Sequence, residues 1–236
     1  MKTTLVLLTT VTLFLLSCKK ESFVTPATEE ACLIQTGDPS GRSYSADSLV
    51  AFNCTSKYCG ILPLSTKNYW VYEDSVFSKG VFLRVQYDTL RFTRTWKSLA
   101  DGLVWWESNI SAGLPEKLYA NDSSIFMMED RLFIPGIMDV KKDYTLFPGD
   151  SIRFLFSFSD NAAICRSLKV RTAFQTPAGT FSDYIYYEKN APYFRKDQTW
   201  LKPGIGVIKY IREKAVLGSP QVKLDQISTL ISYHIE

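Results

Sequence analysis

The sequence is poor in histidine, which limits the catalytic sites that it can build. Of 236 residues only one is histidine, His234, two residues before the last residue given. A serine–histidine or cysteine–histidine catalytic site would have to use this one side chain. A final strand is a poor place for a mobile, well-oriented base. We therefore expect His234 at the surface or at an edge of the fold, outside any catalytic site.

Recognisable cofactor and metal motifs are absent as well. There is no phosphate-binding loop, no HExxH motif and no calcium-loop pattern, and Gly204-Ile-Gly206 lacks the third glycine of a dinucleotide loop. No CxxC spacing or nearby histidine supports a zinc site. From motifs we predict no catalytic residue, no cofactor and no metal.

Charge of one sign is not concentrated anywhere in the chain. The formal net charge is +3 and charged residues make up 22% of the sequence. Nucleic-acid binding needs a clustered basic patch or stripe, so we predict no nucleic-acid partner.

Long hydrophobic runs are also missing. The longest, residues 5–16, has 12 residues and contains three threonines. At about 1.5 Å per residue it is too short for a helix across a ~30 Å hydrocarbon core. Preceded by Lys2, it has the length of a signal-peptide core.

The end of this run carries a more specific signal. Leu15-Leu16-Ser17-Cys18 resembles the lipobox of bacterial lipoproteins. The resemblance implies cleavage after residue 17 and acylation of Cys18, and two or more acyl chains anchor a protein stably. We predict a membrane-anchored lipoprotein of the cell envelope, on the outer membrane. The sequence does not decide between its periplasmic and its outer face. The alternative is an ordinary secretion signal followed by a chance cysteine.

The remaining chain divides by composition. Residues 19 to about 44 are rich in Ser, Thr, Glu, Gly and Pro, as in segments that do not repay the entropy of ordering. We predict a signal peptide over 1–17, then a lipidated N-terminus, flexible tether and cysteine-containing segment over 18–60. A β domain over 61–236 follows.

Four further cysteines are Cys32, Cys54, Cys59 and Cys165. An even number in an oxidising compartment predicts two disulfides. Cys54 and Cys59 could close a small loop, or Cys32 could pair with one of them and Cys165 with the other. Free buried thiols are the alternative.

The sequence from about residue 61 favours strands. Aromatic residues make up 14% of the chain, and Tyr and Phe are frequent in strands. Apolar residues alternate with polar ones in several runs: Val81/Leu83/Val85/Tyr87, Ile152/Phe154/Phe156/Phe158 and Ile227/Thr229/Ile231/Tyr233/Ile235. Alternation of this kind predicts antiparallel strands with one face packed and one in water. The expected fold is all-β, an antiparallel meandering sheet that forms a barrel, half-barrel or sandwich.

Three short motifs add a resemblance. Trp70-Val-Tyr72 (W-x-Y), Pro177-Ala-Gly-Thr-Phe181 (PAG-x-F) and Gly204-Ile-Gly-Val-Ile-Lys209 (G-x-G-x-(V/I)-K) together resemble a group of uncharacterised bacterial envelope lipoproteins with a curved antiparallel β domain. The resemblance implies no activity and no catalytic residue. The motifs also suit folding roles: aromatic packing, a turn, and close backbone approach at glycine.

Aromatic and carboxylate side chains are the remaining candidates for a site. Trp105 and Trp106 point to opposite faces of one strand, so one is expected in the core and the other at the surface. Trp200 is a further candidate exposed aromatic, and exposed aromatics can stack on sugars or hold a partner. Candidates for a pair of hydrolytic carboxylates are Glu73, Asp74, Glu107 and Glu188.

We therefore predict a lipid-anchored envelope protein that acts as a non-enzymatic binding or accessory module. Its partners would be the membrane, through Cys18, and an apolar ligand, a glycan or an envelope protein. The alternatives are a glycan hydrolase with paired carboxylates and a purely structural surface component.

Overall fold

The computed structural model describes residues 32–155, 162–218 and 221–236. Strands dominate these residues, and all but one of the strand pairs are antiparallel, the exception being β1 with β4. A single 3₁₀ turn, η1 at Ala46–Ser48, is the one helical segment within the described ranges. The prediction of an all-β antiparallel fold is confirmed. Cys18 and the proposed signal peptide lie outside the described residues.

The strands follow one another closely along the chain. In order they are β1 (Leu33–Ile34), β2 (Ser43–Ser45), β3 (Leu49–Ala51), β4 (Tyr58–Cys59), β5 (Tyr69–Ser78), β6 (Val81–Ser98), β7 (Val104–Ser108), β8 (Lys117–Ala120), β9 (Ser124–Asp130), β10 (Ile137–Thr145), β11 (Asp150–Phe154), β12 (Ala162–Val170), β13 (Phe174–Thr176), β14 (Gly179–Phe181), β15 (Tyr184–Ala191), β16 (Arg195–Lys202), β17 (Gly206–Lys214) and β18 (Lys223–His234).

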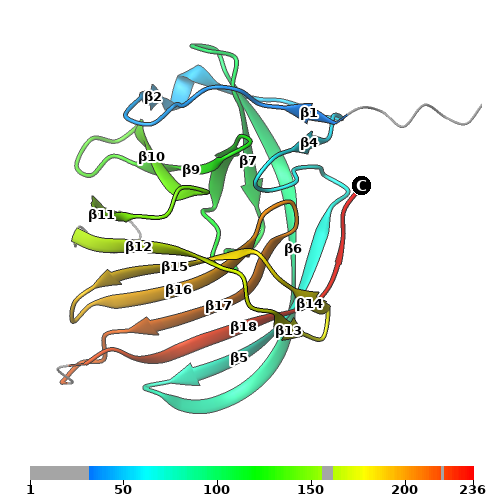
Figure 1. The fold of residues 1–236 in the computed structure, drawn as a ribbon. Coiled ribbons are helices and arrows are strands. Elements are labelled where there is room, and N and C mark those ends of the chain that lie inside the picture. The colour runs from blue at the N-terminus through cyan, green and yellow to red at the C-terminus, as the bar shows by residue number, and fades with distance from the viewer. Residues whose placement is uncertain (1–31, 156–161, 219–220) are drawn as a thin grey trace, which may run out of the picture. The chain divides into compact units, whose positions relative to one another are not determined.

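Fourteen of these strands form one long sheet. Its order is β11-β12-β15-β16-β17-β18-β5-β6-β7-β8-β9-β10-β2, with β3 added beside β6. The long strand β6 belongs to two halves, because its first part pairs with β5 and its last part with β7. We call β11, β12, β15–β18 and β5 the lower half-sheet, and β7–β10 with β2 the upper half-sheet. Figure 1 shows the two half-sheets one above the other, with β6 running from one into the other.

The sheet does not close, because its end strands β11 and β2 do not pair with each other. A side chain bridges part of the gap. The Arg153 guanidinium on β11 donates hydrogen bonds to the backbone carbonyls of Lys142 and Asp143 on β10. The architecture is therefore a folded, open sheet.

The main hydrophobic core lies between the two half-sheets. It joins Trp106 of β7 to Phe92 of β6 and Leu230 of β18, all at most 1% exposed. Burial of this kind contributes about 1.5–3 kcal/mol for each large apolar side chain. The half-sheets are thus held together mainly by apolar packing at one end.

Two of the three motifs meet inside this core. The Trp70 indole N–H donates to the Ile205 carbonyl at 2.7 Å, and the Tyr72 hydroxyl donates to the Val207 carbonyl at 2.8 Å. Gly206 lies between these acceptors at φ +126°, where a Cβ would come 3.0 Å from the Trp70 Nε1. The W-x-Y and G-x-G motifs therefore fit each other, which gives both a role in folding.

A second core covers the other face of the upper half-sheet. Tyr44 of β2 packs edge-on against Trp105 of β7, with 5.9 Å between ring centroids. The other buried members of this cluster are Tyr119, Phe126, Met128, Met138 and Val140. The N-terminal segment therefore acts as a third layer over a sheet face that would otherwise meet water.

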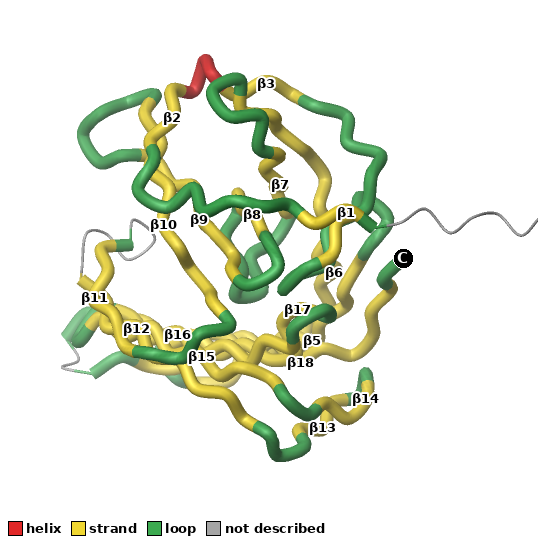
Figure 2. Tube along the Cα trace, turned by 45° about the horizontal axis from the view of Figure 1, so that its top comes forward, coloured by secondary structure: helices red, strands yellow, loops and turns green. Residues whose placement is uncertain are grey.

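This packing changes the expected course of the N-terminal segment. The tether was expected to reach about residue 44, but from Cys32 onward the chain belongs to the compact unit Cys32–Glu236. Strand β2 pairs with β10 and β3 pairs with β6 (Figure 2). Burial of a few apolar side chains offsets the entropy lost when this segment becomes ordered, and the largest of these side chains is Tyr44. A tether over residues 19–31 stays a prediction, since those residues lie outside the described ranges.

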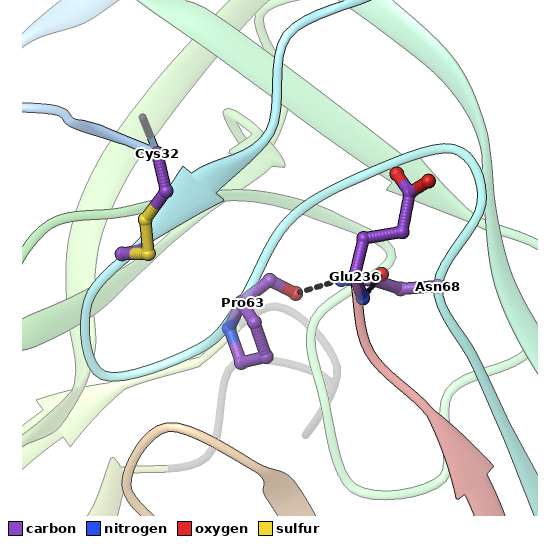
Figure 3. Close-up of a disulfide and its surroundings, with 5 residues drawn as sticks. Cys32, Pro63, Asn68 and Glu236 are labelled. Atoms are coloured by element: carbon purple, nitrogen blue, oxygen red, sulfur yellow. Dashed lines mark hydrogen bonds between the residues drawn. A yellow bond between two sulfur atoms is a disulfide. The ribbon is translucent and has the colours of Figure 1, made fainter. Parts of the chain in front are cut away.

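One disulfide secures the start of this unit. Cys32 is bonded to Cys59, with 5.7 Å between their Cα atoms, whereas Cys54 and Cys165 are free and buried. Figure 3 shows the disulfide close to the C-terminal residue Glu236, whose backbone N–H donates to Asn68. The predicted second disulfide is not formed, because Cys54 and Cys165 lie in different hydrophobic clusters.

The alternation predicted from the sequence is present, but its direction is reversed over much of the lower half-sheet. Val81, Leu83, Val85 and Tyr87 are 44–67% exposed, and Ile152 is 74% exposed. Their polar neighbours, such as Gln86 and Arg153, line cavities on the inner face instead. The physical reason is that the apolar core fills only one end of the space between the half-sheets.

Candidate functional site

A cleft of about 400 Å³ lies between the half-sheets, beyond the end of the apolar core. The loop 111–116 forms part of its wall. The other lining residues are Lys117, Met127, Met128, Glu129, Asp130, Met138, Asp143, Lys189, Arg195, Asp197 and Arg212. The cleft therefore combines five carboxyl and four basic side chains with a few methionine and leucine surfaces.

Strand register explains why so many polar groups meet here. One row of directly opposed residues crosses six adjacent strands of the lower half-sheet. We call it the charged row: Ser151, Cys165, Lys189, Asp197, Arg212 and Gln226. Directly opposed residues lie on the same sheet face, so the whole row faces inward.

The next row toward the core is rich in hydroxyl groups. It consists of Ser167, Tyr187, Thr199, Tyr210, Ser228, Asp74 and Gln86, again from directly opposed positions. We call it the hydroxyl row. Beyond it, Ile185 and Leu201 belong to the apolar core. The inner face thus changes from apolar to hydroxyl-bearing to charged along the strand direction.

A buried cluster of ionic groups forms one wall of the cleft. The Lys189 ammonium lies 2.5 Å from an Asp143 carboxylate oxygen, and both side chains are almost fully buried. Arg153 lies 3.7 Å from the same oxygen. The Lys189 ammonium also lies 4.3 Å from the centre of the Tyr144 ring. Removing one partner of such a buried pair costs about 3–5 kcal/mol, which fixes these side chains in place.

A second cluster stands on the neighbouring strands. Arg195 contacts the Asp197 carboxylate through two nitrogens, at 2.9 and 2.7 Å. The Tyr210 hydroxyl donates to the same carboxylate at 3.1 Å. Burial and the adjacent Asp197 charge raise the pKa of Tyr210 well above its ordinary value. Tyr210 therefore keeps its proton at neutral pH and stays a hydrogen-bond donor.

The loop that roofs the cleft is fixed to both half-sheets. The Tyr144 hydroxyl donates to the Gly113 carbonyl and lies 3.2 Å from the Thr199 hydroxyl. Gly113 has φ +86°, and a Cβ there would come 2.8 Å from the Tyr210 ring. Only glycine fits this position without displacing Tyr210, whose hydroxyl donates to Asp197 of the cleft.

Two further cavities continue the cleft on either side. One of about 310 Å³ shares Asp143 and Lys189 with it, and another of about 400 Å³ shares Ser111 and Arg212. The three cavities follow one another along the inner face of the lower half-sheet through these shared residues, and we refer to them together as the groove.

The free thiol in this groove is not an activated nucleophile. Cys165 lines the smaller cavity and is 4% exposed. Burial raises the pKa of the Cys165 thiol, although Arg153 and Lys189 act in the opposite direction. Because the thiolate is the reactive form, Cys165 at neutral pH remains a buried thiol.

The described residues also contain no cluster of three or more His, Cys, Asp or Glu side chains that could hold a metal ion. His234 is exposed and stacks on Tyr69, outside the lining of the groove. The surface or edge position expected for this residue agrees with the structure.

The structure corrects the prediction that one of Trp105 and Trp106 lies at the surface. Trp105 and Trp106 are both 0% exposed, because each face of β7 packs into its own core. Trp200 is half-buried on the outer face, where it stacks with Phe174 and meets Tyr186 edge-on. None of the three lines the groove.

The four candidate carboxylates do not converge. Asp74 lines the groove, whereas Glu73 accepts a hydrogen bond from Tyr87 on the outer side of the sheet. Glu107 accepts from the Trp96 indole at 2.8 Å. Glu188 lies at the rim and is ion-paired with Lys196.

Sequence reasoning missed the residues that build the cleft. Lys189 and Asp197 lie in segments where polar and apolar residues alternate. Because side chains alternate between the two faces of a sheet, the sequence could have predicted which residues of each strand share a face with them. The sequence offers no signal that this polar face, rather than the apolar one, turns inward.

Comparisons with known proteins add little to this picture. No family model matches the chain, and no curated protein matches it. Two solved structures are similar: a "putative lipoprotein" from Parabacteroides distasonis ATCC 8503 and a "putative exported protein" with a YmcC-like fold from Bacteroides fragilis NCTC 9343. Each has 12% identity and a TM-score of 0.38, and covers 75% of this chain and 99% of its own. A TM-score this low carries no argument about function. Within the described ranges no helix is both long and apolar enough for a membrane span.

Proposed function

We propose that the protein is a lipid-anchored component of the cell envelope that binds a neutral, hydroxyl-rich ligand, such as a glycan segment, in the groove. The anchor would be the acylated Cys18 of the lipobox-like sequence, on the outer membrane. The binding role would be non-enzymatic.

The observation that carries the proposal is the composition of the cleft. Its acidic and basic side chains are nearly balanced in number. Two buried pairs lie within it, Lys189 with Asp143 and Arg195 with Asp197, and Arg212 pairs with Asp225 in the neighbouring cavity. A charged ligand would have to break these pairs, which is costly where they are buried. A neutral ligand would leave them intact.

Hydroxyl groups suit the walls that remain. Carboxylates such as Asp197 accept hydrogen bonds, and cations such as Arg212 donate them. A ligand hydroxyl both donates and accepts, so it can bind to either kind of side chain. Between the charged groups, Met127, Leu114 and Pro115 offer apolar surface for the C–H faces of a sugar ring. Pockets with a few convergent polar groups among apolar surfaces are typical of ligand sites.

The other candidate functions fit the geometry less well. An apolar ligand would need a cavity with few ionisable groups, which this cleft is not. A glycan hydrolase needs two carboxyl groups about 5–9 Å apart on either side of the bond. In the cleft, the carboxylates of Asp143 and Asp197 are instead held in buried ion pairs with Lys189 and Arg195.

The test is native mass spectrometry of the mature protein extracted in detergent from its own membranes. We expect a bound mass that glycosidase treatment of the sample removes. Repeated preparations that show only the bare lipoprotein mass would count against the proposal, as would a bound mass that resists glycosidases.

A further inference from the structure

Three hairpin turns lie side by side at one end of the lower half-sheet. They join β15 to β16 at residues 192–194, β17 to β18 at residues 215–222 and β5 to β6 at residues 79–80. Residues 219–220 of the second turn lie outside the described ranges. Because these six strands are consecutive in the sheet and each pairs antiparallel with the next, the three turns come to the same end. Figure 1 shows them together at the left.

The turns also contact one another. The Ala215 backbone N–H donates to the Phe194 carbonyl at 2.8 Å, which joins the first turn to the second. A Cβ at Gly80 would come 3.6 Å from the Lys223 Cβ, so the third turn lies against the second. The three turns therefore form one surface. We call it the turn surface and define it by residues 79–83, 192–194, 214–218 and 221–223.

Each turn exposes a large apolar side chain. Tyr193 is 79% exposed, Leu217 is fully exposed and Val81 is 67% exposed. Phe82 and Leu83, which follow Val81 in β6, are also more than half exposed. Successive strand residues point to opposite faces of a sheet. Exposure of three consecutive apolar residues therefore means that both faces of this hairpin tip are open to water.

The charge of the turn surface has one sign. Its charged residues are Lys79, Lys214 and Lys223, and it contains no Asp or Glu. Lys214 lies 3.2 Å from Asp225, a residue outside the surface. Lys79 and Lys223 are exposed, and neither has an ion-pair partner in the part of the chain that the structure describes. The turn surface thus combines exposed apolar side chains with free positive charge.

We propose that the turn surface docks onto a lipid bilayer that carries anionic headgroups. Apolar and aromatic side chains next to lysines are typical of protein segments that lie in a membrane interface. The apolar side chains would enter the boundary of the acyl chains, and the lysines would meet the negative headgroups. Lysine is depleted in protein–protein interfaces, so a second copy or another protein fits this composition less well.

The docking goes beyond the proposed function, because it needs neither an acylated Cys18 nor a ligand in the groove. None of the exposed apolar side chains of the turn surface lines the groove. Where the acyl anchor is present, docking would set the orientation of the domain on its membrane.

Vesicle flotation tests the proposal. The mature chain, residues 18–236, is made with Cys18→Ser so that no acyl chain can hold it to lipid. Vesicles of phosphatidylcholine are compared with vesicles of phosphatidylcholine and phosphatidylglycerol in equal parts. We expect a partition coefficient about tenfold higher for the anionic vesicles, from the two free lysines. Failure to float with the anionic vesicles, or equal partition into both kinds, would overturn the proposal.

Variants of the apolar side chains locate the contact. Leu217→Ser and Phe82→Ser should each lower partition into anionic vesicles about fivefold, because each removes apolar surface that would enter the bilayer. Both side chains are more than half exposed, so both variants should keep the thermal midpoint of the parent chain. The matched control is Phe133→Ser in the β9–β10 connection, where the side chain is 92% exposed. It should float like the parent. Unchanged flotation of Leu217→Ser would contradict docking through the turns.

A charge variant and a measurement without lipid complete the test. The double variant Lys79→Gln/Lys223→Gln should lose most of the preference for anionic vesicles, and a preference that stays unchanged would contradict the role of these lysines. Sedimentation of the parent chain without lipid should show a monomer. A dimer that Leu217→Ser dissociates would assign the turn surface to a second copy of the chain and overturn the proposal.

Discussion

Trp105 and Trp106 are neighbours on β7, and both are completely buried, each in a different hydrophobic cluster. Adjacent strand residues point to opposite faces, so both faces of the upper half-sheet must be covered. The lower half-sheet covers one face, and the segment that contains Tyr44 covers the other. The N-terminal segment is therefore part of the core of the domain.

The first prediction concerns this third layer. Trp105→Ala should destabilise the protein by about 3–5 kcal/mol, as large-to-small core substitutions do. Urea unfolding of the full chain measures the change. A loss below about 1 kcal/mol would show that the N-terminal segment does not pack on Trp105 in solution.

Asp101 should make the packing of β2 sensitive to acid. Its Oδ2 accepts hydrogen bonds from the Tyr44 hydroxyl at 2.6 Å and from Arg42 at 2.5 Å. Burial alone would raise the pKa of Asp101, but the donors, Tyr44 foremost, hold it below its ordinary value. A lowered pKa stabilises the fold above the unfolded-state pKa of about 3.9, and this contribution is lost as the pH falls through the folded-state value.

Asp101→Asn should therefore cost about 1–3 kcal/mol at pH 7, as expected for hydrogen bonds to a charged group. The difference from the wild type should shrink as the pH falls from 5 toward 3. Urea unfolding at several pH values tests this, with the exposed Asp47→Asn as the control. A difference that does not change with pH would contradict the role of the Asp101 charge.

The disulfide gives a chemical prediction. Mass mapping under denaturing, non-reducing conditions should recover a Cys32–Cys59 cystine peptide and alkylated Cys54 and Cys165. Because the bond spans 27 residues, Cys59→Ala should lower the free energy of unfolding by about 3–4 kcal/mol. A cystine peptide that contains Cys165 would contradict this pairing.

The proposed anchor is tested at Cys18. Cys18→Ala should move the protein out of the membrane fraction and abolish palmitate labelling, because the acyl chains hold it there. Cell fractionation and metabolic labelling measure both effects. Unchanged retention in the membrane would refute the anchor.

The sequence predicts the strands of the fold better than it predicts the residues of the site. Period-two patterns in the runs that begin at Val81 and Ile227 predicted strands, and strands are there as β6 and β18. The faces were misjudged at Val81–Tyr87 and at Ile152, since apolar residues were expected to pack inward. Which face turns inward depends on how the whole sheet folds at β6, and local sequence does not encode that.

The charged row shows the same limit. Its members come from six successive strands of the sheet, from Ser151 to Gln226, and only the register aligns them in one row. Register depends on bulges, such as the one between Trp200 and Leu201, that no sequence pattern announced. The motifs that could be read, at Trp70 and Gly206, turned out to support the core next to the groove.

Binding of neutral glycans in the groove is the central claim, and calorimetric titration of cleft variants tests it most directly. Neutral oligosaccharides, such as chitotetraose and xylohexaose, would be titrated into the full chain, into Arg212→Gln and into the control Arg94→Gln. Arg212 lines the cleft, whereas Arg94 lies at the exposed outer surface beside Glu107. We predict that at least one oligosaccharide binds the wild type and Arg94→Gln equally, and binds Arg212→Gln about tenfold more weakly, a difference of about 1.4 kcal/mol. No binding by any of them, or equal binding to all three proteins, would contradict the claim.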